Sequence, residues 1–262
     1  MVFRDANWDE LVRQGYTVVS GAIDGASLRA AQQAGNDLTA AFPDGWQRSK
    51  NELWREIKDC THPAFLAIAG NVLDPLATEI LETAHTPDRI QFSQTLPTFS
   101  TAGIIGRHFH IDGGLGPSLA VFNILFGVAL TDVASDTAGG FHVLPGSHDG
   151  FAAFFREQPA DTPHWGEVKQ AAQKRFHAGA QMIVPKLNAG DIIVAHSFLA
   201  HGTSANTTGK RRDMFFQRRA AQPLMDPETK ENARATFMRD HWAFFRRHPA
   251  RSVSNQTAST PR

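Results

Sequence analysis

The sequence predicts one mainly β domain with flanking helices, arranged as a sandwich or barrel. Three observations lead to this fold class. A length of 262 residues is usual for a single all-β or mixed domain. The hydrophobic fraction of 42% and the charged fraction of 20% are ordinary for a globular protein. From Arg89 to Arg219 the chain consists of short β-rich runs separated by Gly, Pro, Asn and Asp, which is typical of sandwiches and barrels.

Helices are expected on both sides of this β region. Residues 7–13 suit a short helix, and the β-branched run at 16–19 suits a strand. Residues 22–41 and 63–84 carry apolar positions at helical spacing, so two more helices precede the main β region. Residues 226–247 have helix-forming composition. We therefore place the domain at 1–251 and expect 252–262 to be a flexible polar tail.

The predicted strands lie in runs that are rich in β-branched and aromatic residues and bounded by turn residues. These runs are RIQFSQTL, GIIGRHFHI, LAVFNILFGVAL, GGFHVL, QMIVP, DIIVAH and DMFFQRR. Residues 151–178 interrupt them with charged and aromatic residues, so we expect a helical or loop insertion there, near a pocket mouth.

Composition argues against several classes of protein. Lys plus Arg and Asp plus Glu number 26 each, so no overall field steers the chain toward nucleic acid or an anionic membrane. The single cysteine, Cys60, fits a reducing compartment. The opening MVFRDANWDELVRQG lacks the apolar stretch of a signal peptide. We expect a cytoplasmic protein, monomeric or homodimeric, that acts on a small molecule.

The most informative pattern is His110-Ile111-Asp112 at the end of a predicted strand. Residues two apart on a strand point to the same face, so the imidazole and the carboxylate lie side by side. They supply two of the three ligands of the two-histidine, one-carboxylate triad, which leaves open positions on iron. A lone His-x-Asp is common by chance, and an exposed turn is its ordinary explanation.

Two later residues strengthen the metal hypothesis. The run Gly190 to Val194 leads into His201, which follows Asp112 by 89 residues (201 − 112). In a double-stranded β-helix, a separation of this length returns the chain to the neighbouring strand. Arg212 follows His201 within TTGKRRDMFFQRR. Its guanidinium is suited to a bidentate pair with the far carboxylate of a dicarboxylic co-substrate.

Taken together, HFHID, GGFHVLPGSH and GDIIVAHSFLAHGTSANTTGKRR resemble the phytanoyl-CoA dioxygenase family, which includes ectoine hydroxylase. The opening QGYTVVSGAID resembles the first helix and strand of that family. The resemblance implies a double-stranded β-helix of the jelly-roll, cupin-like kind, with iron(II), 2-oxoglutarate and dioxygen as reactants.

By motif position, the resemblance implies that His110, Asp112 and His201 bind the metal and that Arg212 anchors 2-oxoglutarate. Thr203 matches a hydroxyl position that contacts the same carboxylate in the family. Two further candidates for co-substrate contact are Gln91 and Asn123, and the candidates for substrate contact are Trp46, Arg48, Trp54 and Phe109. Halogenating relatives carry a small residue in place of the carboxylate, so Asp112 favours hydroxylation or another oxidation.

Plainer explanations remain open for several of these residues. His108 shares a face with His110 under strict alternation and competes as a ligand. His142, His148 and His196 have a plainer explanation as histidines that satisfy loop or core hydrogen bonds, and for His142 this explanation is preferred to catalysis. Arg211 must face away from Arg212 on a strand, and we select Arg212 by its spacing from His201. The aromatic stretch that holds Trp46 and Trp54 is as consistent with surface packing as with substrate contact.

The predicted reaction is hydroxylation of an unactivated carbon of an amino acid or natural-product intermediate, with release of succinate and carbon dioxide. The same cofactors also support desaturation, cyclisation or epimerisation. Other classes of protein are a non-catalytic metal-binding or small-molecule-binding β-helix protein and a cupin-type isomerase or sugar-binding protein. The last two would not need Arg212.

Overall fold

A computed structural model describes residues 3–42, 47–49, 52–96, 109–112, 121–157, 171, 174 and 181–249. Its main feature is an antiparallel sheet with strand order β1-β8-β6-β10-β5-β3-β2, in which β4 also pairs with β10. The strands are Tyr16–Val19 (β1), Gln47–Ser49 (β2), Glu52–Ile57 (β3), His85–Pro87 (β4), Gln91–Leu96 (β5), Ile124–Ala129 (β6), Ile192–His196 (β8) and Arg212–Ala221 (β10).

A second, smaller sheet joins β7 (Phe141–Val143) to β9 (His201–Thr203). Isolated bridges extend it on both sides, because Val143 also pairs with Ile183 and His201 also pairs with His110. Four separate segments of the chain therefore lie side by side here.

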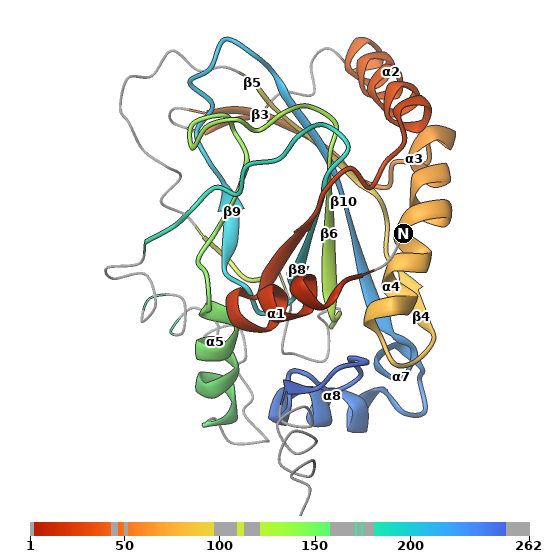
Figure 1. The fold of residues 1–262 in the computed structure, drawn as a ribbon, viewed down its shortest axis with the longest axis vertical. Coiled ribbons are helices and arrows are strands. Elements are labelled where there is room, and N and C mark those ends of the chain that lie inside the picture. The colour runs from red at the N-terminus through yellow and green to blue at the C-terminus, as the bar shows by residue number, and fades with distance from the viewer. Residues whose placement is uncertain are drawn as a thin grey trace, which may run out of the picture.

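Helices cover the face of the large sheet that is turned away from β9 (Figure 1). Helices α2, α3 and α4 lie on that side. The helices are Asp5–Gln14 (α1), Gly25–Ala41 (α2), Pro63–Ile68 (α3), Asp74–Ile80 (α4), Ser147–Arg156 (α5), Gln222–Met225 (α7) and Lys230–Arg239 (α8), with a π-helical turn at Ala69–Leu73 between α3 and α4. Within the described ranges, no helix is long and apolar enough to cross a membrane.

The large sheet separates two apolar cores. Phe215 of β10 stacks on Phe65 of α3 at 5.2 Å between ring centroids, and it belongs to the core under the helices. Met214, which precedes Phe215 in β10, belongs to the other core together with Phe141 of β7. Successive strand residues point to opposite faces, so β10 contributes alternately to each core. We call the face that carries Met214 the inner face of the sheet.

The structure confirms most of the predicted elements and corrects one region. The helices over 7–13 and 22–41 are present, and the third is divided by the π-helical turn. Before the main β region the sequence predicts the strand at 16–19 and the helices, but it does not predict β2 and β3, which also lie there. Polar residues occur on both faces of β3: Arg55 pairs with Gln94 and Glu56 with Ser93. The hydrophobic alternation that marks a half-buried strand is therefore absent.

Candidate metal centre

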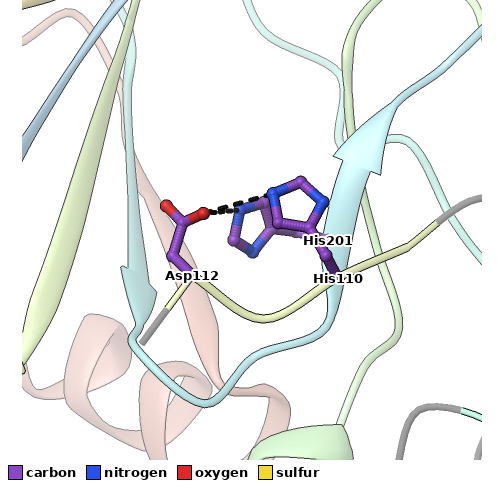
Figure 2. Close-up of side chains that lie close together, drawn as sticks. All are labelled: His110, Asp112 and His201. Atoms are coloured by element: carbon purple, nitrogen blue, oxygen red, sulfur yellow. Dashed lines mark ion pairs between the residues drawn. The ribbon is translucent and has the colours of Figure 1, made fainter. Parts of the chain in front are cut away.

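His110, Asp112 and His201 converge at the inner edge of the small sheet (Figure 2). His110 Nε2 lies 3.1 Å and His201 Nε2 lies 3.7 Å from the same carboxylate oxygen, Asp112 Oδ1. The two imidazole rings are 4.6 Å apart between centroids. His201 is buried and Asp112 is partly buried, while the side chain of His110 is 53% exposed. One side of the cluster is therefore open to a ligand.

Backbone pairing brings these distant residues together. His110 N donates to His201 O at 2.8 Å, and His201 N donates to His110 O at 2.9 Å. His201 Nδ1 lies 2.9 Å from the carbonyl oxygen of Leu199, which makes Nδ1 the protonated nitrogen and leaves Nε2 free for a metal. Phe141 stacks on His201 at 4.8 Å and limits its rotation.

The protonation states also suit a cation. Burial alone would raise the pKa of Asp112, but His201, His110 and Arg218 hold it well below its usual range. Burial lowers the pKa of His201 to about 4, so this imidazole is neutral at pH 7. Arg218 is a permanently charged group beside Asp112. A neutral imidazole and an ionised carboxylate are the forms that bind metal.

These donors fit a divalent transition metal. Two imidazole nitrogens and one carboxylate oxygen form a facial set, and imidazole with carboxylate suits non-haem iron(II). The hydrogen bond from His201 to Leu199 is the outer contact that metal-binding histidines usually have.

A second cluster joins His148, Asp149 and His241. His241 Nε2 lies 2.9 Å from Asp149 Oδ1, and His148 Nε2 lies 3.1 Å from the carbonyl oxygen of Val12. Among the described residues, the Nδ1 atoms of both histidines are buried without a hydrogen-bond partner. Histidines that hold metal through Nε2 usually donate Nδ1–H to an acceptor, so this cluster is better explained as a hydrogen-bonded link between α1, α5 and the segment after α8.

His148 gives a prediction for stability against pH. Burial lowers its pKa from 6.5 to about 4, so between these pH values the unfolded chain binds a proton that the folded chain does not. The free energy of unfolding should therefore rise with pH across this window, and fall by about 1.4 kcal/mol per pH unit as pH drops from about 6.5 toward 4. Burial lowers the pKa of His196 as well, which adds to the slope.

Urea unfolding of the metal-free protein at several pH values measures this slope. His148→Gln keeps a donor for the Val12 carbonyl but does not titrate, so its slope should be shallower. Equal slopes in the two proteins would contradict the assignment.

Arg212 is fully buried on the inner face of β10. Its Nε donates to Gly139 O, and its Nη1 donates to Ser93 O at 3.1 Å and Ser93 Oγ at 3.3 Å. Burial lowers its pKa to about 10, so it remains charged at neutral pH. Within the described part of the chain its hydrogen bonds go to neutral oxygens, although a buried charge normally has a partner of opposite charge. A carboxylate that reached this guanidinium could therefore form an ion pair with it.

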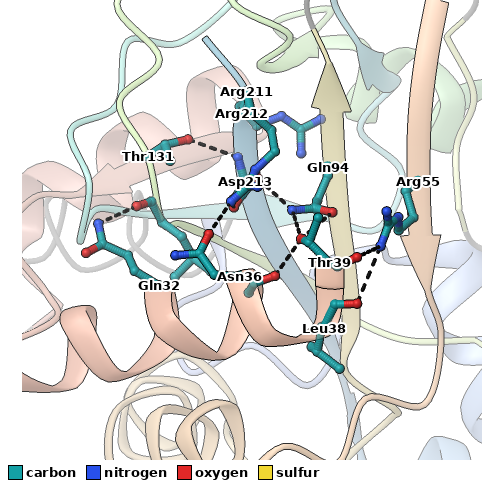
Figure 3. Close-up of polar contacts among 12 residues, drawn as sticks. Gln32, Asn36, Leu38, Thr39, Arg55, Gln94, Thr131, Arg211, Arg212 and Asp213 are labelled. Atoms are coloured by element: carbon teal, nitrogen blue, oxygen red, sulfur yellow. Dashed lines mark hydrogen bonds and ion pairs between the residues drawn. The ribbon is translucent and has the colours of Figure 1, made fainter. Parts of the chain in front are cut away.

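Arg211 faces the other side of the sheet, as the alternation predicts (Figure 3). It pairs with Asp213 Oδ2 at 2.7 Å and donates to Asn36 Oδ1 of α2 at 2.7 Å. Gln94 Nε2 donates to Asp213 Oδ1 at 3.1 Å, which ties the same network to β5. The two neighbouring arginines therefore lie in different environments.

Gly139 lets the chain pass close to Arg212. Its φ is +70°, and a Cβ there would collide with the hydroxyl of Thr95. We expect Gly139→Ala to lower the free energy of unfolding by about 1–3 kcal/mol through overpacking and backbone strain. Denaturant midpoints measure this loss. Gly209→Ala is the control, because a Cβ at Gly209 meets nothing within 4 Å. Equal stability of the two variants would contradict the crowding at Gly139.

The remaining candidates are spread over the fold. Trp54 and Thr95 are directly paired, and so are Thr95 and Arg212, so Trp54 and Arg212 share the inner face. Gln91 shares this face and donates to Glu56 Oε1. Asn123 is buried, and its Oδ1 accepts from Ala221 N at 2.7 Å.

Other candidates lie away from these contacts or outside the description. The side chain of Thr203 is exposed at the end of β9. Phe109, the residue before His110, is buried. Trp46 and His108 lie outside the described residues, as does the side chain of Arg48. His196 is a satisfied core histidine, because its Nε2 lies 2.9 Å from His241 O and its Nδ1 accepts from Phe198 N at 3.0 Å.

Sequence reasoning missed Arg218, which contacts Asp112 directly. A usable signal existed, since Arg218 has the same strand parity as Arg212 and therefore shares its face.

Comparisons with known proteins identify a family and several similar folds. A model of the family described as phytanoyl-CoA dioxygenase matches residues 11–214. No curated relative matches the sequence. The non-heme alpha ketoglutarate dependent carbocyclase SnoK from nogalamycin biosynthesis superposes with a TM-score of 0.63 at 16% identity, covering 83% of this chain and 84% of that one.

Two more solved structures share the fold. HygX from Streptomyces hygroscopicus, with nickel, 2-oxoglutarate and hygromycin B bound, superposes with a TM-score of 0.55 at 14% identity and covers 84% of this chain and 88% of its own. EctD from S. alaskensis, with bound Fe, gives a TM-score of 0.57 at 20% identity over 83% of this chain and 76% of its own. At these identities the likeness shows the fold.

Proposed function

The chain belongs to the phytanoyl-CoA dioxygenase family, whose model matches 11–214 of its 262 residues, and on this premise we propose that it is an iron(II)- and 2-oxoglutarate-dependent dioxygenase. We propose that His110, Asp112 and His201 hold the iron. The observation that carries this proposal is the approach of both histidine Nε2 atoms to Asp112 Oδ1. The reaction is hydroxylation of an unactivated carbon, with succinate and carbon dioxide as the other products.

Bound iron supplies the activation of dioxygen that is coupled to decarboxylation of 2-oxoglutarate. The residues of this chain supply geometry and charge. The bridge between His110 and His201 fixes the distance between the imidazoles. The carboxylate of Asp112 is ionised without a metal, so it needs no deprotonation before a cation binds. No side-chain general base is required for this reaction.

The role of Arg212 is to bind the far carboxylate of 2-oxoglutarate. Its buried charge has neutral hydrogen-bond partners within the described residues, and a dicarboxylic acid brings the missing negative charge. Gly139 connects Arg212 to the metal centre. Arg212 donates to Gly139 O, and Phe141, which follows Gly139 by two residues, stacks on His201. The contacts of Thr203, Gln91 and Asn123 with the same co-substrate remain part of the proposal.

The architecture supports the proposal of a double-stranded β-helix. The row formed by Ile183, Val143, His201 and His110 lies across an apolar core from the large sheet. We propose that these two layers are its two sheets. We also propose one catalytic domain over 1–251, with an insertion near 151–178 and a tail at 252–262.

A small molecule is the proposed substrate, either an amino acid or a natural-product intermediate. HygX shares the fold and has hygromycin B bound, which supports a substrate of this general kind. Trp54 is a candidate contact because it is half-buried on the same sheet face as Arg212. Trp46, Arg48 and Phe109 remain the other proposed contacts.

Isotope-labelled dioxygen tests the outcome of the reaction. Protein with iron(II) and 2-oxoglutarate is supplied with a panel of small amines and acids, and succinate and products are analysed by mass spectrometry. Hydroxylation predicts that one compound accelerates succinate formation and gains one labelled oxygen atom. A product that has lost two hydrogens without gaining oxygen would show desaturation or cyclisation instead. Iron binding without any succinate would favour a binding protein.

A further inference from the structure

Arg218 lies behind the carboxylate of Asp112. Its Nε donates to Asp112 Oδ2 at 2.8 Å, and its Nη2 donates to the same oxygen. The histidines approach the other oxygen, Oδ1. The two oxygens of one carboxylate are therefore divided between the imidazole pair and the guanidinium.

Arg218 is itself held in place. Asp88 Oδ1 accepts from the backbone N of Arg218 at 2.8 Å, and Asp88 Oδ2 lies 3.4 Å from its Nη1. Asp88 N also donates to the carbonyl oxygen of Arg218 at 3.1 Å. The guanidinium carbon lies 5.5 Å from the centre of the Phe122 ring. These contacts hold the Arg218 guanidinium in place independently of Asp112.

We infer that Arg218 is a positioning residue that occupies Oδ2 of Asp112, so that the carboxylate offers only Oδ1 to the metal. This inference rests on the proposed function. It gives Arg218 a role that differs from that of Arg212 on the same face of β10. Arg212 is proposed to bind a carboxylate of the co-substrate, whereas Arg218 binds a carboxylate of the protein, Asp112.

One-oxygen binding matters because the reaction needs open metal positions. Bound 2-oxoglutarate would occupy two metal positions through its keto acid end, and dioxygen would need a further one. A carboxylate that bound through both oxygens would take one of these. By holding Oδ2 in a charge-assisted hydrogen bond, Arg218 keeps that position open.

The positive charge of Arg218 also repels a metal ion bound to Asp112, and this repulsion acts against the positioning effect on metal affinity. Asp88 lies against Arg218 and offsets much of its charge. Among the described residues, the side chains that form a hydrogen bond or ion pair with Asp112 are those of Arg218 and the two histidines. Without Arg218 the carboxylate would lose its fixed orientation, so positioning should outweigh repulsion.

The test measures Mn²⁺ binding to metal-free protein by calorimetry, with Mn²⁺ as an oxygen-stable substitute for iron(II). We expect Arg218→Met to bind Mn²⁺ about 10–100-fold more weakly than wild type, the usual effect of losing an outer contact to a ligand. Arg218→Lys should recover only part of this loss, because a point charge replaces a planar fork. Arg89→Met is the control, since Arg89 pairs with the exposed Asp59.

Arg212→Met separates positioning from general damage. It should weaken 2-oxoglutarate binding while leaving Mn²⁺ affinity unchanged, which is the reverse of the pattern for Arg218→Met. If Arg218→Met fails to fold, Asp88→Asn weakens the support of Arg218 instead, with a smaller expected loss of Mn²⁺ affinity. Wild-type affinity in Arg218→Met, or full recovery with lysine, would overturn the positioning role. Absence of Mn²⁺ binding by wild type would overturn the proposed function itself.

Discussion

Asp112→Ala should abolish succinate formation and metal binding together. The substitution removes the charged ligand that both histidine Nε2 atoms face. Loss of an outer contact to a metal ligand usually costs about 10–100-fold, so loss of the ligand itself should reduce turnover by more than about 100-fold. Succinate release under saturating iron(II) and 2-oxoglutarate measures this effect.

Asp149→Ala is the matched control for this experiment. Asp149 also lies between two histidines, but in the cluster whose Nδ1 atoms have no acceptor among the described residues. Its removal should leave metal-dependent turnover intact. Full activity of Asp112→Ala, or loss of metal from Asp149→Ala, would show that the two clusters have been assigned the wrong roles.

Arg212→Met should weaken 2-oxoglutarate binding without weakening the fold. Two hydrogen bonds to a carboxylate contribute roughly 3 kcal/mol, so the Kd for 2-oxoglutarate should rise about 100-fold. Methionine has a similar volume and removes a buried charge, which offsets the lost hydrogen bonds to Gly139 and Ser93. The melting temperature of the protein without co-substrate should therefore not fall.

Arg211→Met provides the comparison. Arg211 is the sequence neighbour of Arg212, yet it points to the outer face and pairs with Asp213. Its loss should leave the Kd for 2-oxoglutarate unchanged. If both variants lost 2-oxoglutarate affinity equally, the assignment by strand face would be wrong. If neither did, the anion site would have to lie elsewhere.

The metal centre combines a local feature that the sequence predicts well with a long-range feature that local rules do not predict. His110 and Asp112 are close because a strand repeats every two residues, which is a local rule. Their approach to His201 depends on long-range pairing, and only the resemblance to a family with the same motifs indicated it. The opposite directions of Arg211 and Arg212 follow from local alternation and are confirmed.

Other features depend on packing that local patterns do not encode. The strand β3 was missed because Trp54 and Glu56 are half-buried on the inner face, while the charged Arg55 is buried under α2. Arg218 was missed because its importance comes from Asp112 and Asp88, which lie far away in the sequence. Ion pairs between residues that are far apart in the chain leave little trace in a single sequence.

Succinate formation by the wild-type protein tests the central claim most directly. Anaerobic protein is mixed with iron(II) and 2-oxoglutarate, dioxygen is admitted, and succinate and carbon dioxide are quantified beside His201→Ala. The account predicts equal amounts of both products from wild type and background amounts from the variant, which lacks the buried imidazole at the centre of the site. Equal succinate from both proteins, or none from iron-loaded wild type, would contradict it.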